Sequence, residues 1–414
     1  LGELFSETIN FEKAKKYLEE ATQISRDFFG SDSRNHSSAS YALGDLYINL
    51  GSYDKAEELI TRALEIIEPI VGKGHPTYSN YLGNLAALYK TMGLYEKSEE
   101  LQLETIALRS TSEGVEHPNY ASAWGDLAIL YEVLGKYEES DSLFTLSRQI
   151  KIRSLGENYP GLAKDFNNHA YLYKAIGEYD KAEKLFLEGL ELVEENLGKE
   201  HPDYLLLIHN LGELMIYIGQ YERAEQYLTE SMEKNERIHG KHHFSYLYSL
   251  GTLAGVYYFL RDRTKALELM LELNQLIREA DLESHPDQGI IYSNLGLFFV
   301  GIGENQRAEV NYIKYLEVTE NHFGKYHPRY SRTAYLLAYL LEQTEQYEKA
   351  DSLYKSTLKN FEQHLGSRHP DYINCLAALG KLNWIRGKTE AAYPLLAESA
   401  FLELERVQKL YPVL

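Results

Sequence analysis

One short motif recurs along this chain at a fixed spacing of 42 residues. The clearest copy runs from Gly219 to Ala224, with the sequence Gly-Gln-Tyr-Glu-Arg-Ala. Further copies are punctuated at Gly51, Gly93, Gly135, Gly177, Gly303 and Gly387, and weaker ones at Ile9, Arg261 and Glu345. Self-similarity at a period between about 20 and 50 residues is typical of a solenoid, in which each repeat packs only on its neighbours. The sequence therefore predicts a repeat array.

Each repeat is predicted to form two helices joined by a turn. In the second repeat, the first helix is expected over Ser37–Leu50 and the second from Asp54 to about Val71. A fixed position of the first helix holds a large residue followed by Gly or Ala, as in Leu211-Gly212. The second helix has a small residue with a large apolar one four positions later, on the same helix face. This pairing indicates that the two helices cross closely at the small residues.

The loop between repeats has its own signature. Glycine recurs at 30, 72, 114, 156, 198, 240, 324 and 366, where it is expected to end the second helix in a left-handed conformation. Proline follows His at 75, 117, 201, 285, 327 and 369 and is expected in the first turn of the next helix.

The large-small-aromatic pattern of the first helix and the small-large pattern of the second resemble the tetratricopeptide repeat, over the whole chain. The 42-residue period and the His-Pro loop are similar to the repeats of kinesin light chains and of many bacterial signalling proteins. The resemblance implies an all-α, right-handed superhelical solenoid of about ten helix-turn-helix units, forming a single domain over residues 1–414. The chain starts inside a helix of the repeat pattern and without Met, so we expect a fragment of a longer protein.

Composition narrows the class of partner. The chain carries 62 acidic and 42 basic residues, a net charge of −20, which disfavours a nucleic acid. We expect a protein or peptide partner that is basic or apolar. No apolar run is long enough to span a membrane, so no membrane partner is expected and the cytoplasm is the default compartment.

Candidate chemistry is weak throughout. The His-Pro histidines lie one repeat apart and cannot converge on one metal ion. A loop metal site at His239, His242 and His243 is conceivable, but a solvated loop is the preferred interpretation. The single cysteine, Cys375, has no visible base beside it and is interpreted as a buried packing residue. We expect no enzymatic activity, no cofactor and no metal.

The resemblance implies that the first helices line a concave groove. Apolar and aromatic residues at the lining positions of the later repeats are predicted to bind a partner. Asparagines just before the large residue either clamp a partner's backbone or bond to their own repeat, and the sequence leaves both open. The predicted partner-binding residues are Asn168, Asn210, Leu206, Tyr217, Tyr248, Tyr258, Phe259, Ile290, Asn294, Leu297, Tyr335, Tyr339 and Trp384.

The preferred functional hypothesis is a protein–protein interaction scaffold that binds a polypeptide in this groove. The alternative is the sensing and regulatory region of a bacterial caspase-like CHAT protease, because the repeats and the stretch from Leu395 to Leu414 resemble arrays that precede such domains. A cargo adaptor resembling kinesin light chain is a third possibility, although no heptad segment is present to pair with a motor.

Overall fold

The computed structural model describes residues 11–279 and 288–410, which form helices joined by short turns, with no strand among them. The first helices of the repeats are α3 (Arg34–Asn49), α5 (Pro76–Thr91), α7 (Pro118–Val133), α9 (Leu162–Ala175), α11 (Pro202–Tyr217), α13 (Phe244–Phe259), α15 (Gln288–Gly301), α17 (Pro328–Gln343) and α19 (Pro370–Ile385). The second helices are α2 (Phe11–Phe29), α4 (Tyr53–Val71), α6 (Tyr95–Ser112), α8 (Tyr137–Leu155), α10 (Tyr179–Leu197), α12 (Tyr221–His239), α14 (Arg263–Glu279), α16 (Asn305–Phe323), α18 (Tyr347–Leu365) and α20 (Thr389–Leu410). The predicted all-α helix-turn-helix repeats are confirmed.

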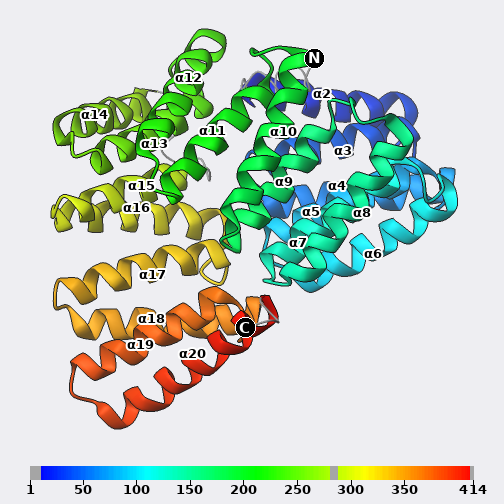
Figure 1. Ribbon diagram of the computed structural model, residues 1–414. Helices are drawn as coiled ribbons and strands as arrows, with labels where there is room; N and C mark the ends of the chain where they lie inside the picture. Colours follow the sequence, from blue (N-terminus) through cyan, green and yellow to red (C-terminus); the bar gives the residue numbers. More distant parts are fainter. Residues whose placement is uncertain (1–10, 280–287, 411–414) are drawn as a thin grey trace. The chain divides into compact units, whose positions relative to one another are not determined.

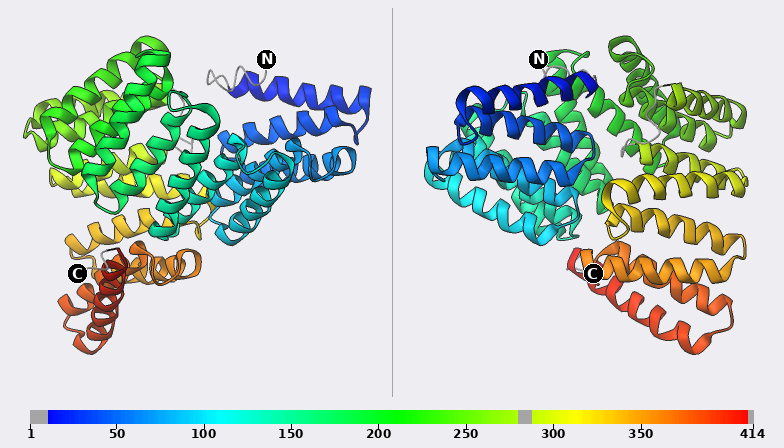
Figure 2. Two further views of the ribbon diagram at one scale, coloured as in Figure 1. Left: turned by 45° about the vertical axis from the view of Figure 1, so that its right-hand side comes forward. Right: turned by 180° about the vertical axis from the view of Figure 1, so that it is seen from behind.

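The helices group into two compact units. Unit 1 comprises Leu1–Val133 and Glu139–Asp165, and unit 2 comprises Leu134–Glu138 and Phe166–Leu414. Helices that follow one another in the chain pack together, as α17 to α20 show in Figure 1 and, from two further directions, in Figure 2. One continuous domain over residues 1–414 stays a prediction.

The small residues of the first helix lie where the second helix crosses it. A Cβ atom added to Gly212 would lie 2.6 Å from Cγ of Leu228, and one added to Gly296 would lie 2.4 Å from the ring of Tyr312. Leu228 and Tyr312 are the large residues of the small-large pattern in α12 and α16, and both are fully buried. The close crossing inferred from the sequence is confirmed.

The turn inside each repeat requires a positive φ. Its glycines, at 51, 93, 135, 177, 219, 303 and 387, have φ values between 68° and 82°. Arg261 and Glu345 occupy the same turn position with φ of 65° and 62°. A Cβ atom in this region comes too close to the following carbonyl oxygen and costs about 1–2 kcal/mol, so these two turns are strained relative to the glycine turns.

The loop glycines differ from the expectation in one respect. Gly72 and Gly198 have φ of 76° and 85°, but ψ of 159° and 168°. These values lie outside the left-handed helical well and inside a region that is essentially restricted to glycine. The loop therefore constrains residue type more strongly than a left-handed cap would.

The histidines of the loop cap the following helix. Their Nδ1 atoms accept a hydrogen bond from the backbone N–H two residues on, at 3.0–3.2 Å, in His75, His117, His201, His243, His327 and His369. Capping of this kind satisfies a backbone donor that no helical carbonyl can reach. In the second repeat Ser33 takes this place and accepts from His36 N, so α3 begins at Arg34, three residues before the expected start.

Candidate functional site

Large apolar or aromatic side chains are exposed on the first helices of unit 2. We define the apolar strip as Leu206, Tyr217, Phe259, Leu297, Tyr339 and Trp384. These side chains are between 42% and 63% exposed, although all are large and apolar or aromatic. They come from α11, α13, α15, α17 and α19, of which α11 contacts α13, α13 contacts α15 and α17 contacts α19. These exposed side chains therefore all lie on first helices, several of which are direct neighbours.

The remaining predicted lining residues are less accessible. Asn168, Tyr248, Tyr258, Asn294 and Tyr335 are half-buried. The hydroxyl of Tyr258 donates a hydrogen bond to the carbonyl oxygen of Gly301 at 2.7 Å and so ties α13 to α15. Ile290 lies in α15, but its side chain is outside the described residues.

Asn210 belongs to the packing between repeats. It is 1% exposed, its amide nitrogen donates to Oδ1 of Asn167 at 2.6 Å, and its amide oxygen accepts from the hydroxyl of Tyr171 at 2.8 Å. Both amide groups are therefore occupied by the chain itself. For Asn210 this geometry matches neither interpretation of the asparagines, because both of its partners are side chains of the preceding repeat.

A buried charge that was not among the predicted site residues lies beneath this face. The carboxylate of Glu213 accepts from the hydroxyl of Tyr248 at 2.6 Å and pairs with Nζ of Lys174 at 3.0 Å. Burial opposes its ionisation, but the imidazole of His209 and the ammonium of Lys174 outweigh that effect and hold the pKa of the carboxyl below its ordinary value. Glu213 lies two residues after the large residue Leu211, and this position of the first helix is one that is predicted to line the groove. A charged residue there was the sequence signal that could have identified it.

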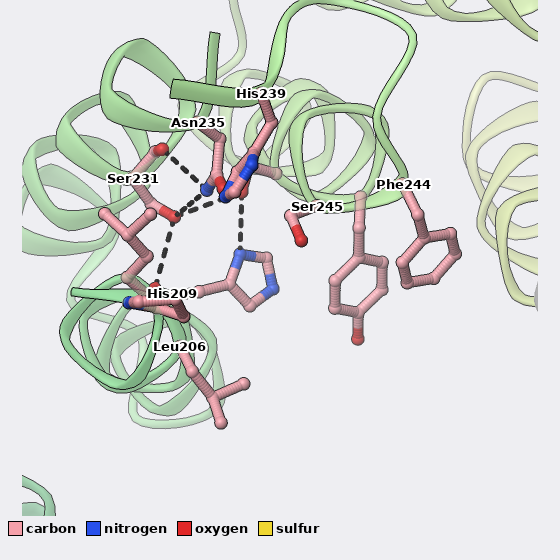
Figure 3. A pocket seen from close by; sticks show the side chains of 11 residues that line it. Leu206, His209, Ser231, Asn235, His239, Phe244 and Ser245 are labelled. Carbon is pink, nitrogen blue, oxygen red and sulfur yellow. Dashed lines mark hydrogen bonds between the residues drawn. The ribbon is translucent and has the colours of Figure 1, made fainter. Parts of the chain in front are cut away.

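A pocket of about 200 Å³ lies between α11, α12 and α13 (Figure 3). Its polar side is a chain of hydrogen bonds: Nδ1 of His209 lies 3.1 Å from Oγ of Ser249, which lies 3.2 Å from Oγ of Ser231. Asn235 turns back on its own helix, because its amide nitrogen donates to the carbonyl oxygen of Ser231 at 2.9 Å. We refer to this cavity as the α11–α13 pocket.

Apolar groups form the other walls of the α11–α13 pocket. The ring of Tyr248 stacks on that of His209 at a centroid distance of 4.5 Å, and Phe244 stacks beside Tyr248 at 5.7 Å. Leu206 of the apolar strip lies at the edge of the same pocket. The pocket therefore combines aromatic faces, an aliphatic edge and a polar floor, and it opens beside the apolar strip.

An equivalent pocket of about 210 Å³ lies between α17, α18 and α19. Its lining positions are those of the first pocket advanced by 126 residues, which is three repeats: Arg332, Tyr335, Phe361, Asp371 and Asn374 correspond to Leu206, His209, Asn235, Ser245 and Tyr248. The single-sequence pattern did not predict either pocket, because their residue types differ from repeat to repeat.

The loop histidines and Cys375 contact other groups of the chain. No group of three or more His, Cys, Asp or Glu side chains in that part of the chain could hold a metal ion. In the loop considered above, His239 stacks on His243 at 4.2 Å, while His242 lies 3.4 Å from Glu279. Burial raises the pKa of the Cys375 thiol to about 12, so it stays protonated at neutral pH.

Among the described residues, no helix has both the length and the apolar character that crossing a membrane would require.

Comparison with known proteins identifies the repeat. A tetratricopeptide repeat family model matches residues 1–68, 36–111, 77–153, 119–195, 166–234, 207–273 and 287–363. No curated protein matches the chain. Similar solved structures include the following three, all at low identity.

The first is a crystal structure of a putative kinesin light chain from Podosopora anserina with nearly identical TPR-like repeats, at 24% identity and a TM-score of 0.43, covering 50% of this chain and 97% of that one. BtubC (BKLC) from P. vanneervenii has 20% identity and a TM-score of 0.46, over 56% and 91% of the two chains. Pseudomonas aeruginosa pilF has 18% identity and a TM-score of 0.40, over 59% and 93%. The family matches together span more than half of the chain, which therefore belongs to the tetratricopeptide repeat family.

Proposed function

We propose that this array is a non-catalytic scaffold that binds a polypeptide partner along the apolar strip. The observation that carries the proposal is the exposure of Tyr217 and Trp384, at 63% and 61%, on first helices of unit 2. Packing of the repeats does not require large aromatic groups at exposed positions. Aromatic side chains are enriched among the residues that dominate binding energy at protein interfaces.

The apolar side chains of the strip and the net charge of the chain indicate which kind of partner would bind. Large apolar side chains would be buried against the strip, and each is worth about 1.5–3 kcal/mol when fully removed from water. The net charge of −20 favours a partner with basic residues beside its apolar ones, through faster encounter and better selection. Asn168 and Asn294, which are half-buried, are the proposed polar contacts to the partner's backbone.

A display library of random peptides, captured on the immobilised chain, tests the proposal. The variant Phe259→Ser/Leu297→Ser removes two apolar groups of the strip that are 46% and 50% exposed. Each change should cost more than about 1 kcal/mol of binding if the strip is used, so we expect at least about a tenfold loss of affinity for selected peptides. Tyr258 is left unchanged because its hydroxyl holds α13 to α15.

The matched control is Leu271→Ser/Val310→Ser. These residues are 51% and 54% exposed and lie on the second helices α14 and α16. The two substitutions remove a similar amount of apolar surface, but from second helices rather than first helices. Peptide binding should therefore be unchanged. An equal loss in both variants, or a loss in the control alone, would contradict binding along the first helices.

Two finer hypotheses stay predictions. In the first, the array regulates a caspase-like CHAT protease domain, and sequencing the reading frame beyond Leu414 would reveal such a domain or exclude it. In the second, the protein acts in the cytoplasm, and imaging of the tagged full-length gene product in its native cell would test this.

A further inference from the structure

The α11–α13 pocket is a position that the repeat of α5 and α6 fills with a side chain of its own. In the α11–α13 pocket Asn235 is too short to cross the cavity and bonds back to Ser231. His209, which is 4% exposed, lies on the pocket wall, and its Nε2 atom has no hydrogen-bond partner. That atom lies 3.7 Å from the Glu213 carboxylate, which is too long for a hydrogen bond, although the imidazole is close enough to help lower the pKa of that carboxyl. One polar atom of the pocket wall, Nε2 of His209, is thus left without a hydrogen bond.

The corresponding position between α5, α6 and α7 holds an arginine. Arg109 stands where Asn235 stands three repeats later. Its guanidinium donates to Oδ1 of Asn80 on α5 at 2.9 Å and to the carbonyl oxygen of Asn119 on α7 at 2.7 Å. Gly83, at the position of His209, leaves room for the arginine side chain. The cation therefore spans the space between two first helices and satisfies neutral acceptors on both.

A basic group recurs at this position in one further repeat. Lys151, the next residue in the series, donates to both carboxylate oxygens of Asp165 at 2.7 and 2.9 Å. In the α17–α19 pocket this position is Phe361, and a basic group joins the lining from the position of Leu206, where Nε of Arg332 pairs with Asp371 at 2.6 Å. The first repeat of the series differs, because a stack of Tyr41 on Tyr81 at 4.0 Å lies there. Tyrosine is therefore the competing occupant that a test has to include.

We propose that the α11–α13 pocket receives an arginine side chain of the polypeptide partner. This inference rests on the proposed function, and it names one residue type that the partner presents beside its apolar residues. The partner's guanidinium takes the place that Arg109 occupies between α5 and α7, and its aliphatic stem lies against Leu206.

The size and lining of the pocket fit this occupant. A buried cavity of about 150 Å³ is enough to hold a benzene ring, so a space of about 200 Å³ accommodates a planar guanidinium with part of its stem. Phe244 offers an aromatic ring on which a guanidinium stacks more favourably than an ammonium, while the ring of Tyr248 already stacks on His209 and Phe244. The amide oxygen of Asn235 and the hydroxyls of Ser231 and Ser249 are acceptors, as Asn80 and the Asn119 carbonyl are for Arg109.

Saturation-transfer NMR with single amino acids tests the proposal. The probes are the N-acetyl amides of arginine, lysine, tyrosine and leucine, each added to the whole chain at the same concentration. We expect the arginine probe to bind most strongly. In His209→Gly/Asn235→Arg, which copies the Gly83 and Arg109 pair into this repeat, its affinity should fall about tenfold.

A second variant guards against misfolding of the first. Ser245→Phe places a ring at the half-buried edge of the pocket, at a position that carries Arg329 and Asp371 in other repeats. It should give the same loss, with circular dichroism and unfolding curves showing an intact fold. The strip variant Phe259→Ser/Leu297→Ser should leave the arginine signal unchanged, because neither residue lines the pocket.

The outcomes separate this inference from the proposed function. A tyrosine or leucine probe that binds more strongly than arginine overturns the inference, as does an arginine signal that both pocket variants leave unchanged. Neither result decides whether peptides bind along the apolar strip, which is tested separately with Phe259→Ser/Leu297→Ser and its control. An arginine signal lost in the pocket variants supports the pocket even if the strip variant still captures peptides.

Discussion

At the scale of single residues, the repeat depends on glycines for two different reasons. At Gly212 a side chain is excluded by Leu228 of the crossing helix, whereas at Gly72 the backbone conformation itself excludes it. Sequence alone identified both sets, since each recurs with the period. It also predicted their separate causes, a close helix crossing and a special backbone conformation, but it did not predict the ψ of 159° at Gly72.

The steric cause can be tested with two helical glycines. Gly212→Ala places a Cβ 2.6 Å from Leu228 and should lower the free energy of unfolding by about 1–3 kcal/mol. Gly255→Ala, on α13, meets nothing within 4 Å and should raise it by roughly 0.5–1 kcal/mol, because alanine favours the helix. Urea unfolding followed by circular dichroism measures both. Equal effects from the two changes would show that the crossing adapts freely.

At the scale of helices, the sequence predicted where elements lie better than what their loops do. The large-small pattern located α11 and α12 because burial imposes it in every repeat. The capping role of the histidines was not predicted. Their hydrogen-bond partner is a backbone N–H, which every non-proline residue has, so the sequence around the histidines does not reveal it. The α11–α13 pocket was missed for the opposite reason: His209 and Asn235 differ from their counterparts Gly83 and Arg109, and a pattern search discards such differences.

The caps make helix α13 sensitive to pH. Burial, with the nearby His239, lowers the pKa of His243 to about 4, and a proton on Nδ1 would end its hydrogen bond to Ser245 N. An unfolded histidine has a pKa of about 6.5, so the unfolded chain binds the extra proton first as pH falls. The contribution of His243 to stability is therefore full above about pH 6.5 and is lost as pH falls towards about 4.

The variant His243→Ser keeps a capping oxygen, as Ser33 does for α3, and removes the titrating group. The unfolding midpoint in urea, measured from pH 7 to pH 4, should fall less steeply with pH in the variant than in the parent chain. Identical slopes would mean that protonation of His243 does not contribute. His242→Ser is the control, because His242 is exposed and caps no helix.

At the scale of the whole molecule, stability is a sum of repeats and of contacts between neighbours. The contacts fall into two units rather than one core, so a local change should stay local. The apolar strip and the α11–α13 pocket both belong to unit 2. The candidate binding surface is therefore carried by one part of the array.

Hydrogen exchange with mass spectrometry can follow this locality. In Gly212→Ala, amides of α11 and α12 and of their neighbours α10 and α13 should exchange faster, while those of α3 to α6 should keep the rates of the parent chain. Nearest-neighbour coupling predicts this gradient. Faster exchange of equal size along every described helix would instead indicate a single cooperative unit.

The α11–α13 pocket is assembled across a repeat boundary, since α11 and α12 lie before Gly240 and α13 lies after it. One 42-residue repeat, the unit that a gene can duplicate or delete, therefore contains only part of the pocket. Loss of the 42 residues from Gly198 to His239 would set Asn167 and Val193 opposite Ser245 and Tyr248. Such a deletion would create a hybrid cavity, with different lining residues at a boundary between two repeats. Recombination between these repeats shuffles half-sites, and an array can acquire a different preference without a single point mutation.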